Sequence, residues 1–141
     1  MQLRHGRIEL ALHELRTGTG PGLLLLHSLW GSSGDWGDEV AGWPGPVHAL
    51  DLAGHGSSGW LRGGSYSPEQ FASDADAAIA ELGSVRLAGT GVGAYAALLL
   101  AGARPDQVPA ALLLPGCGLE GGGPVPEFLA PADERPLDVP D

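Results

Sequence analysis

Residues 84–103 have the sequence SVRLAGTGVGAYAALLLAGA, and this stretch decides the fold. Residues 84–89 predict a short strand, and the Ala- and Leu-rich residues 92–103 predict a helix that ends at Arg104-Pro105. A tight Thr90-Gly91 turn joins the two. A strand that passes through a glycine-containing turn into a helix is the building unit of a parallel α/β sheet.

Further strands and helices alternate around this unit. Short apolar runs predict strands that are covered on both faces, at residues 23–26, 46–51 and 111–114. Residues 2–16 alternate apolar and polar side chains, which predicts half-buried strand structure with a turn at His5-Gly6.

Two helices complete the expected order. Ser67 is placed to cap a helix that starts at Pro68 and stops at Gly83. A short helix is expected at residues 35–43. The alternation predicts an α/β fold: a mostly parallel sheet with helices on both faces and functional loops at the carboxyl ends of the strands.

Composition limits the classes of partner. The chain of 141 residues has 17 acidic side chains against 7 basic ones, all Arg, and a net charge of −10. Without a basic cluster we expect neither a nucleic-acid partner nor binding to a membrane surface. Cys117 is the single cysteine, and the first residues lack the apolar core of a signal peptide. We therefore expect a cytoplasmic protein.

The chain is expected to divide into two parts. Residues 1–119 carry the strand and helix signals of one domain. Residues 120–141 hold 8 Gly or Pro in 22 positions, with acidic residues between them. This composition predicts an extended, disordered tail.

Three loops at strand ends together resemble the α/β-hydrolase family. Residues 23–31 (LLLLHSLWG) are similar to the strand and HG-x oxyanion loop of that family, with Ser28 where Gly is usual. Residues 50–58 (LDLAGHGSS) resemble its D-x-x-G-H-G-x-S turn. Residues 87–94 (LAGTGVGA) stand in the place of the nucleophile elbow G-x-S-x-G. The resemblance implies a fold with about eight strands, of which five or six are found here, so the chain corresponds to the family's N-terminal part.

The catalytic positions depart from the family pattern. Gly91 stands where the family has its nucleophilic serine, so no acyl intermediate can form there. Thr90 is a doubtful substitute, because its side chain leaves the strand end in another direction. The family's acid and histidine follow the serine in the chain, but no histidine follows His55 and the late carboxylates lie in the tail. The resemblance therefore implies a protein that is catalytically incomplete.

Backbone groups of the resembled site remain. The amides of Leu29 and Val92 can converge on a carbonyl oxygen or an anion, next to Ser28 and His27. Such a pocket polarises a bound group without completing a hydrolytic cycle. We interpret His27, His55 and Asp51 as residues that order these loops rather than as a base or an acid.

The sequence leaves several functions open. The first is binding of a small apolar or carbonyl-bearing ligand, and the second is a hydrolase of small esters or amides completed by another segment. The third is weak dinucleotide binding, because Gly89, Gly91 and Ala94 match G-x-G-x-x-A, although no acid ends the next strand. No cofactor and no metal is expected. The free edge of strand 111–114 predicts self-association or pairing with a partner chain.

Overall fold

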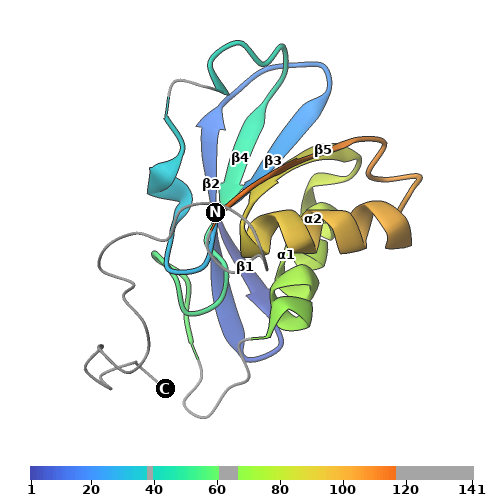
Figure 1. The fold of residues 1–141 in the computed structure, drawn as a ribbon. Helices are drawn as coiled ribbons and strands as arrows, with labels where there is room; N and C mark the ends of the chain where they lie inside the picture. Colours follow the sequence, from blue (N-terminus) through green and yellow to red (C-terminus); the bar gives the residue numbers. More distant parts are fainter. Residues whose placement is uncertain (38–39, 61–66, 117–141) are drawn as a thin grey trace.

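The computed structural model describes residues 1–37, 40–60 and 67–116. These residues form one sheet of six strands with two α-helices (Figure 1). The strands are β1 (Gln2–His5), β2 (Ile8–Arg16), β3 (Gly22–Leu26), β4 (Val47–Leu50), β5 (Val85–Thr90) and β6 (Ala111–Leu114). The helices are a single 3₁₀ turn η1 (Ser33–Asp35), α1 (Pro68–Leu82) and α2 (Val92–Ala103). Residues of the expected tail lie outside the described residues.

The order of the strands confirms the predicted mostly parallel sheet. It is β1-β2-β4-β3-β5-β6, in which β4, β3, β5 and β6 run parallel. The hairpin β1–β2 joins the parallel part through the antiparallel pair β2–β4. The carboxyl ends of β3, β4 and β5 therefore meet at one edge of the sheet, where the three resembled loops begin.

Alternate residues of the strands face two different hydrophobic clusters. Leu24 and Leu26 of β3 point toward α1 and α2, which both pack on this face of the sheet. Leu23 and Leu25 point to the opposite face, which is covered by Trp36, Val40 and Trp43. Both clusters bury their strand residues almost completely, and this burial is the main stabilising contribution to the fold.

The face of the sheet opposite α1 and α2 differs from the prediction of helices on both faces. In the described part of the chain both α-helices share one face, and the helix expected at residues 35–43 is wrong. Of residues 35–43, the described ones form no α-helix: η1, capped by a reciprocal Ser32–Asp35 box, ends at Asp35, and Val40 has a 3₁₀ conformation. Gly37 and Gly42 lower the helix propensity of the following residues, so tryptophan side chains cover this face instead.

The ends of α1 are those that its local sequence predicts. The Ser67 hydroxyl accepts a hydrogen bond from the Gln70 amide at 3.2 Å, and Pro68 opens the helix. At the other end Gly83 has a φ of 82° and donates its amide to Ile79 at 2.8 Å. Residues with short polar side chains and glycine satisfy the free backbone groups at the two ends of a helix.

Helix α2 lies unusually close to the sheet because two glycines carry no side chain. A Cβ atom on Gly93 would overlap the carbonyl oxygen of Leu26 and lie 2.6 Å from that of His27. A Cβ atom on Gly89 would overlap the carbonyl of Gly93 itself. The first turn of α2 therefore rests directly on the backbone at the end of β3.

Two alanine substitutions in α2 test this contact. Gly93→Ala is expected to lower the free energy of unfolding by about 3 kcal/mol, because the new methyl group meets rigid backbone. Gly102→Ala is the matched control: no atom lies within 4 Å of its Cβ position, and a gain of a few tenths to about 1 kcal/mol is expected from helix propensity. Urea denaturation of both variants measures the two values, and equal effects would contradict the close approach.

Candidate functional site

Gly91 forms the tip of the turn between β5 and α2. Its backbone has φ 60° and ψ −123°, a left-handed conformation in which a residue with a side chain is strained. This is the sharp strand-to-helix turn that displays a nucleophile in the resembled elbow. The Gly91 amide donates to Leu114 of β6 at 3.1 Å, and its carbonyl accepts from Ala94 at 3.0 Å. The turn is intact, but its tip carries only hydrogen.

The hydroxyl of Thr90 is occupied by a structural hydrogen bond. Its Oγ1 donates to the carbonyl of Pro115 at 2.8 Å, which fastens the end of β5 to the segment after β6. All five histidines of the chain lie in the described residues. None of their ring nitrogens is bonded to Thr90 there. Within the described residues, Thr90 therefore has no imidazole as a hydrogen-bond partner.

His27 follows β3 and is completely buried. Its Nδ1 donates to the Ser28 carbonyl at 2.7 Å, and its Nε2 accepts from the Leu52 amide at 3.0 Å. This pattern fixes the neutral tautomer, and burial lowers the pKa of His27 to about 4. Both nitrogens are used to join the loop after β3 to the loop after β4.

His55 has the equivalent place in the loop after β4. Its Nδ1 donates to the Ala53 carbonyl at 3.0 Å, and its Nε2 accepts from the Trp30 amide at 3.1 Å. Its ring lies 4.9 Å from that of His27 and meets Phe71 of α1 edge-on at 5.5 Å. These are the contacts of a side chain that orders loops.

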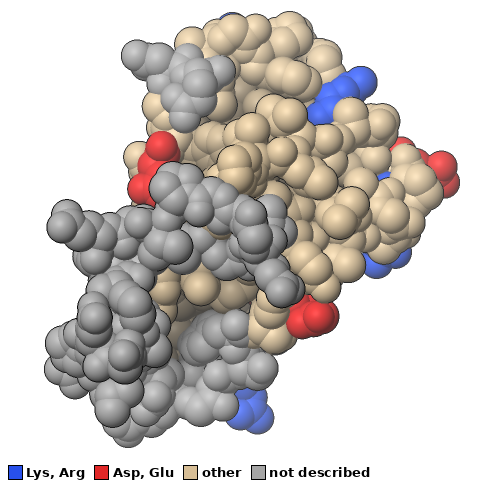
Figure 2. Space-filling view, viewed as in Figure 1, with Lys and Arg blue, Asp and Glu red and all other residues tan. Residues whose placement is uncertain are grey.

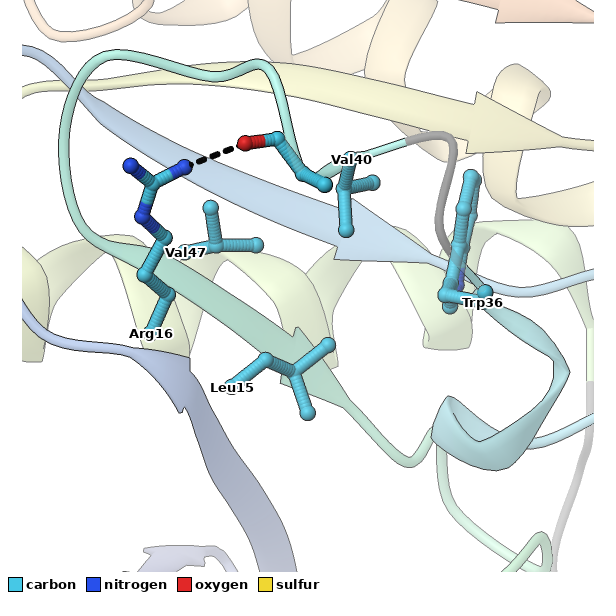
Figure 3. A pocket seen from close by; sticks show the side chains of 7 residues that line it. Leu15, Arg16, Trp36, Val40 and Val47 are labelled. Atoms are coloured by element: carbon cyan, nitrogen blue, oxygen red, sulfur yellow. Dashed lines mark hydrogen bonds between the residues drawn. The ribbon is translucent and has the colours of Figure 1, made fainter.

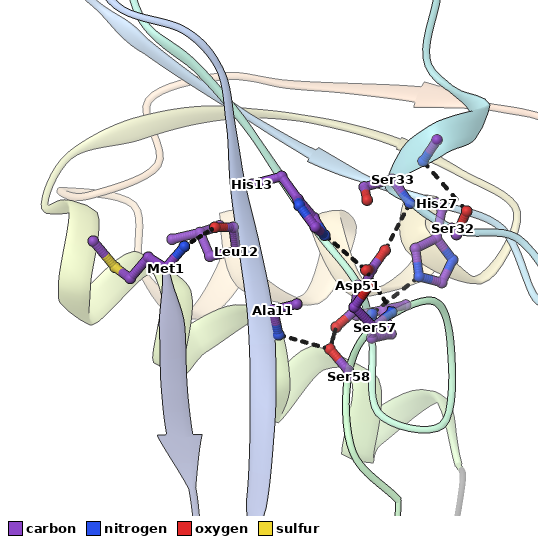
Figure 4. A network of polar contacts seen from close by, with 12 residues as sticks. Met1, Ala11, Leu12, His13, His27, Ser32, Ser33, Asp51, Ser57 and Ser58 are labelled. Atoms are coloured by element: carbon purple, nitrogen blue, oxygen red, sulfur yellow. Dashed lines mark hydrogen bonds and ion pairs between the residues drawn. The ribbon is translucent and has the colours of Figure 1, made fainter.

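Asp51, directly after β4, is the centre of a polar network (Figure 4). One carboxylate oxygen accepts from the Ser33 amide at 2.8 Å; the other accepts from the Ser57 amide and lies 2.9 Å from Nε2 of His13. Burial works against ionisation of Asp51, but hydrogen bonds from Ser33, Ser57 and His13 outweigh it and lower its pKa. A Cβ atom on Gly56 would overlap this carboxylate, so glycine is required there.

A second carboxylate was missed by the sequence reasoning. Asp74 of α1 is fully buried and accepts from the Ala53 amide at 3.0 Å and from Nε2 of Gln70 at 3.1 Å. Burial raises the pKa of Asp74. Its position three residues after Phe71, on the apolar stripe of α1, is the signal that would have identified it.

The two backbone amides predicted for ligand binding lie on adjacent segments. Val92 is the first residue of α2, and the contact of Gly93 with the carbonyls of Leu26 and His27 brings this helix start to the loop that contains Leu29. In the described part of the chain, neither the Leu29 nor the Val92 amide donates a hydrogen bond. Ser28 contributes its carbonyl, which accepts from the His27 ring and the Gly31 amide.

A hollow of about 460 Å³ lies on the face of the sheet opposite α1 and α2 (Figure 3). Leu15, Val40 and Val47 form its apolar wall, with Trp36 at one end and Arg16 at the other. The Arg16 guanidinium donates to the carbonyls of Ala41 and Trp43. The hollow shares no residue with the elbow or with the Asp51 network.

The described part of the chain has neither a metal-binding cluster nor a membrane-spanning helix. It contains no group of three or more His, Cys, Asp or Glu side chains arranged to hold a metal ion. It also contains no helix with the length and apolarity needed to cross a bilayer.

The comparisons with known proteins agree with this geometry. Esterase Rv0045c of Mycobacterium tuberculosis is 32% identical over 93 residues, which are 64% of this chain and 31% of the esterase. The structure of a membrane phospholipase A, a bacterial virulence factor, matches with a TM-score of 0.73 and 28% identity, over 81% of this chain and 38% of the phospholipase. The chain has the α/β-hydrolase fold. No family model matches it.

A third similar structure is the thioesterase domain from the curacin biosynthetic pathway. It has a TM-score of 0.72 and 29% identity, over 81% of this chain and 44% of that domain. The chain thus spans between 31% and 44% of the length of these three relatives. By their names, these three relatives are an esterase, a phospholipase and a thioesterase domain.

The protonation of His27 should make the free energy of unfolding depend on pH. Folded His27 stays neutral down to about pH 4, whereas an unfolded histidine titrates near pH 6.5. Between these values the unfolded chain binds the extra proton, so stability falls as pH decreases, by on the order of 3 kcal/mol. His27→Gln should remove this part of the slope. Denaturation curves measured at several pH values test it, and parallel profiles for the two proteins would contradict it.

Proposed function

We propose that this domain binds a small carbonyl-bearing ligand at the Leu29 and Val92 amides and does not hydrolyse it. The observation that carries the proposal is Gly91, which keeps the backbone of the nucleophile elbow and has no attacking atom. An ester, amide or thioester fits this site best, because these are the carbonyl groups on which the chemistry of the fold acts.

The inference of inactivity also depends on the base. General base catalysis needs an imidazole nitrogen that is free to accept a proton near the reacting group. In His27 and His55 both ring nitrogens are engaged in loop hydrogen bonds. The Nε2 atom of the His13 ring is bonded to the Asp51 carboxylate. Of the other two histidines, His5 is bonded to Ser73 and His48 lies 3.7 Å from Glu14, so we infer that no histidine serves as a base for residue 91.

Binding is supported by what the turn retains. The first amides of a helix are unpaired and aligned, and they favour a negative or polarised oxygen. The Val92 amide has this position at the start of α2, and the Leu29 amide belongs to the loop that His27 and His55 hold in place. Because these donors are fixed before the ligand arrives, binding a carbonyl oxygen costs little reorganisation.

A second candidate is a hydrolase of small esters that is active only when another segment completes the site. The matched relatives extend well beyond the matched region, because the chain covers only 38% and 44% of two of them. This difference in length favours the second candidate. It would still require a nucleophile other than residue 91. Dinucleotide binding has less support, because β6 ends at Leu114-Pro115 with no carboxylate for a ribose.

Restoring the hydroxyl alone should not restore hydrolysis. Gly91→Ser places a side chain at the tip of the elbow, but no free imidazole lies beside it, so release of p-nitrophenol from p-nitrophenyl butyrate should stay at the wild-type level. Circular dichroism confirms folding of the variant. Steady-state hydrolysis that appears with Gly91→Ser would show that a base is present and would overturn the proposal.

Removing one amide donor tests binding directly. Val92→Pro deletes the N–H at the first position of α2, where proline is tolerated. Val92→Ala is the matched control, which shortens the same side chain and keeps the N–H. We expect saturable binding of p-nitrophenyl butyrate, seen as a downward shift of its carbonyl stretching frequency, to be about ten-fold weaker in Val92→Pro than in Val92→Ala.

Three results would contradict the binding proposal. They are equal affinity of Val92→Pro and Val92→Ala, absence of a saturable shift in the wild-type chain, and wild-type turnover of the ester that falls in Thr90→Val. The last of these would favour the second candidate, because it would assign the attack to the Thr90 hydroxyl.

A further inference from the structure

We propose that the hollow on the face of the sheet opposite α1 and α2 binds a small carboxylate with an apolar body, such as a medium-chain fatty acid. The volume of the hollow is about 460 Å³, within the range of roughly 300–1,000 Å³ that is usual for small-molecule sites. Neither Leu29 nor Val92 lines it, so the inference does not rest on the proposed function.

The hollow lies over β2 and β4, on the side of the sheet away from β6. In the strand order, β3 and β5 separate β4 from β6. The described walls all come from residues 15–47: the end of β2, the start of β4 and the segment between β3 and β4. The shape of the hollow therefore follows from the pairing of β2 with β4 and from the segment that covers this pair.

An irregularity in β2 places two neighbouring residues on the hollow. Consecutive residues of a strand normally point to opposite faces, yet Leu15 and Arg16 both line the hollow. The register of β2 on β4 shifts between them, because Glu14 pairs with His48 whereas Arg16 pairs with Val47. Such β-bulges redirect a side chain and are common next to functional sites. The bulge thus brings a guanidinium and an apolar side chain to the same surface.

The Arg16 guanidinium is held in position by backbone and not by an acidic side chain. Its Nη1 donates to the carbonyls of Ala41 and Trp43 at 2.7 and 2.6 Å. Within the described part of the chain it forms no ion pair with a carboxylate, and its Nε and Nη2 bond no acceptor. These two nitrogens form the planar fork that binds both oxygens of a carboxylate.

The surface next to Arg16 is apolar. Leu15, Val40 and Val47 lie between Arg16 and the indole of Trp36 (Figure 3). Leu15 is 44% exposed, and a hydrocarbon chain that covers it would remove apolar surface from water. The hollow therefore matches a molecule with an anion at one end and a hydrocarbon body.

The single positive charge favours a monoanion. Arg16 is the one charged side chain among the described residues that line the hollow. Figure 2 shows the basic side chains of one face of the molecule as separate patches without a cluster. A phosphate dianion would retain one uncompensated charge beside a chain of net charge −10. A carboxylate carries one charge and is the better match.

Titration of the full chain with decanoate tests the proposal, with 1-decanol as the neutral ligand of equal chain length. The indole N–H of Trp36 is buried and has no hydrogen-bond partner in the described structure, and its NMR signal, assigned with Trp36→Phe, reports on this wall. Decanoate should shift the signal saturably and bind about ten-fold more tightly than 1-decanol. Arg16→Gln should abolish this preference. Arg4→Gln, the same change at an exposed residue of β1, should keep it.

A second variant leaves the Arg16 hydrogen bonds in place. Leu15→Trp adds a large side chain at an exposed position of the hollow, and it should weaken the binding of both decanoate and 1-decanol at least about ten-fold. Circular dichroism verifies the folding of each variant. Because Leu15→Trp does not alter the guanidinium, it keeps the proposal testable if Arg16→Gln does not fold.

Variants at the start of α2 distinguish the hollow from the site of the proposed function. Decanoate should bind to Val92→Pro and Val92→Ala with equal affinity, and a ten-fold difference would assign the carboxylate to the helix start and overturn the proposal. It would also be overturned by the absence of saturable decanoate binding to the wild-type chain, by equal wild-type affinities for decanoate and 1-decanol, or by unchanged affinity in folded Leu15→Trp.

Discussion

The contact between the start of α2 and the end of β3 is the constraint on which the site depends. Gly93 lies so close to the carbonyls of Leu26 and His27 that no side chain fits between them, and Gly89 meets Gly93 in the same way. The turn at Gly91 must then reverse within one residue, in a left-handed conformation. This geometry places the first amide of the helix beside the loop after β3. It depends on the absence of side chains at Gly89 and Gly93.

Buried polar side chains hold the loops that follow the strands in place. Asp51 holds the backbone at Ser33 and Ser57, and Asp74 holds the backbone at Ala53. Loop amides that are buried without a partner would each cost on the order of 1–3 kcal/mol, and the two carboxylates supply those partners. His27 and His55 complete the connection between the loops. The side chains that look most like acids and bases are thus consumed in maintaining the loop structure.

Local signals made most of the fold predictable. The caps of α1, the bounds of α2 and each parallel strand depend on neighbouring residues, and the sequence alone predicts them. The helix expected at residues 35–43 was wrong because the Ser32–Asp35 capping box, which marks the actual turn, lies three residues earlier. The link between His13 and Asp51 had no local signal, since it joins residues 38 positions apart that meet only because β2 pairs with β4.

The fold and the proposed loss of hydrolysis depend on different residues. The fold is specified by apolar strands and by glycines that allow close packing. Replacing a serine by glycine at the elbow relieves backbone strain, because glycine adopts a positive φ without a steric penalty. Glycine at this position therefore favours the turn. Under the proposed function, the aligned amides of the site are kept while the attacking side chain is absent.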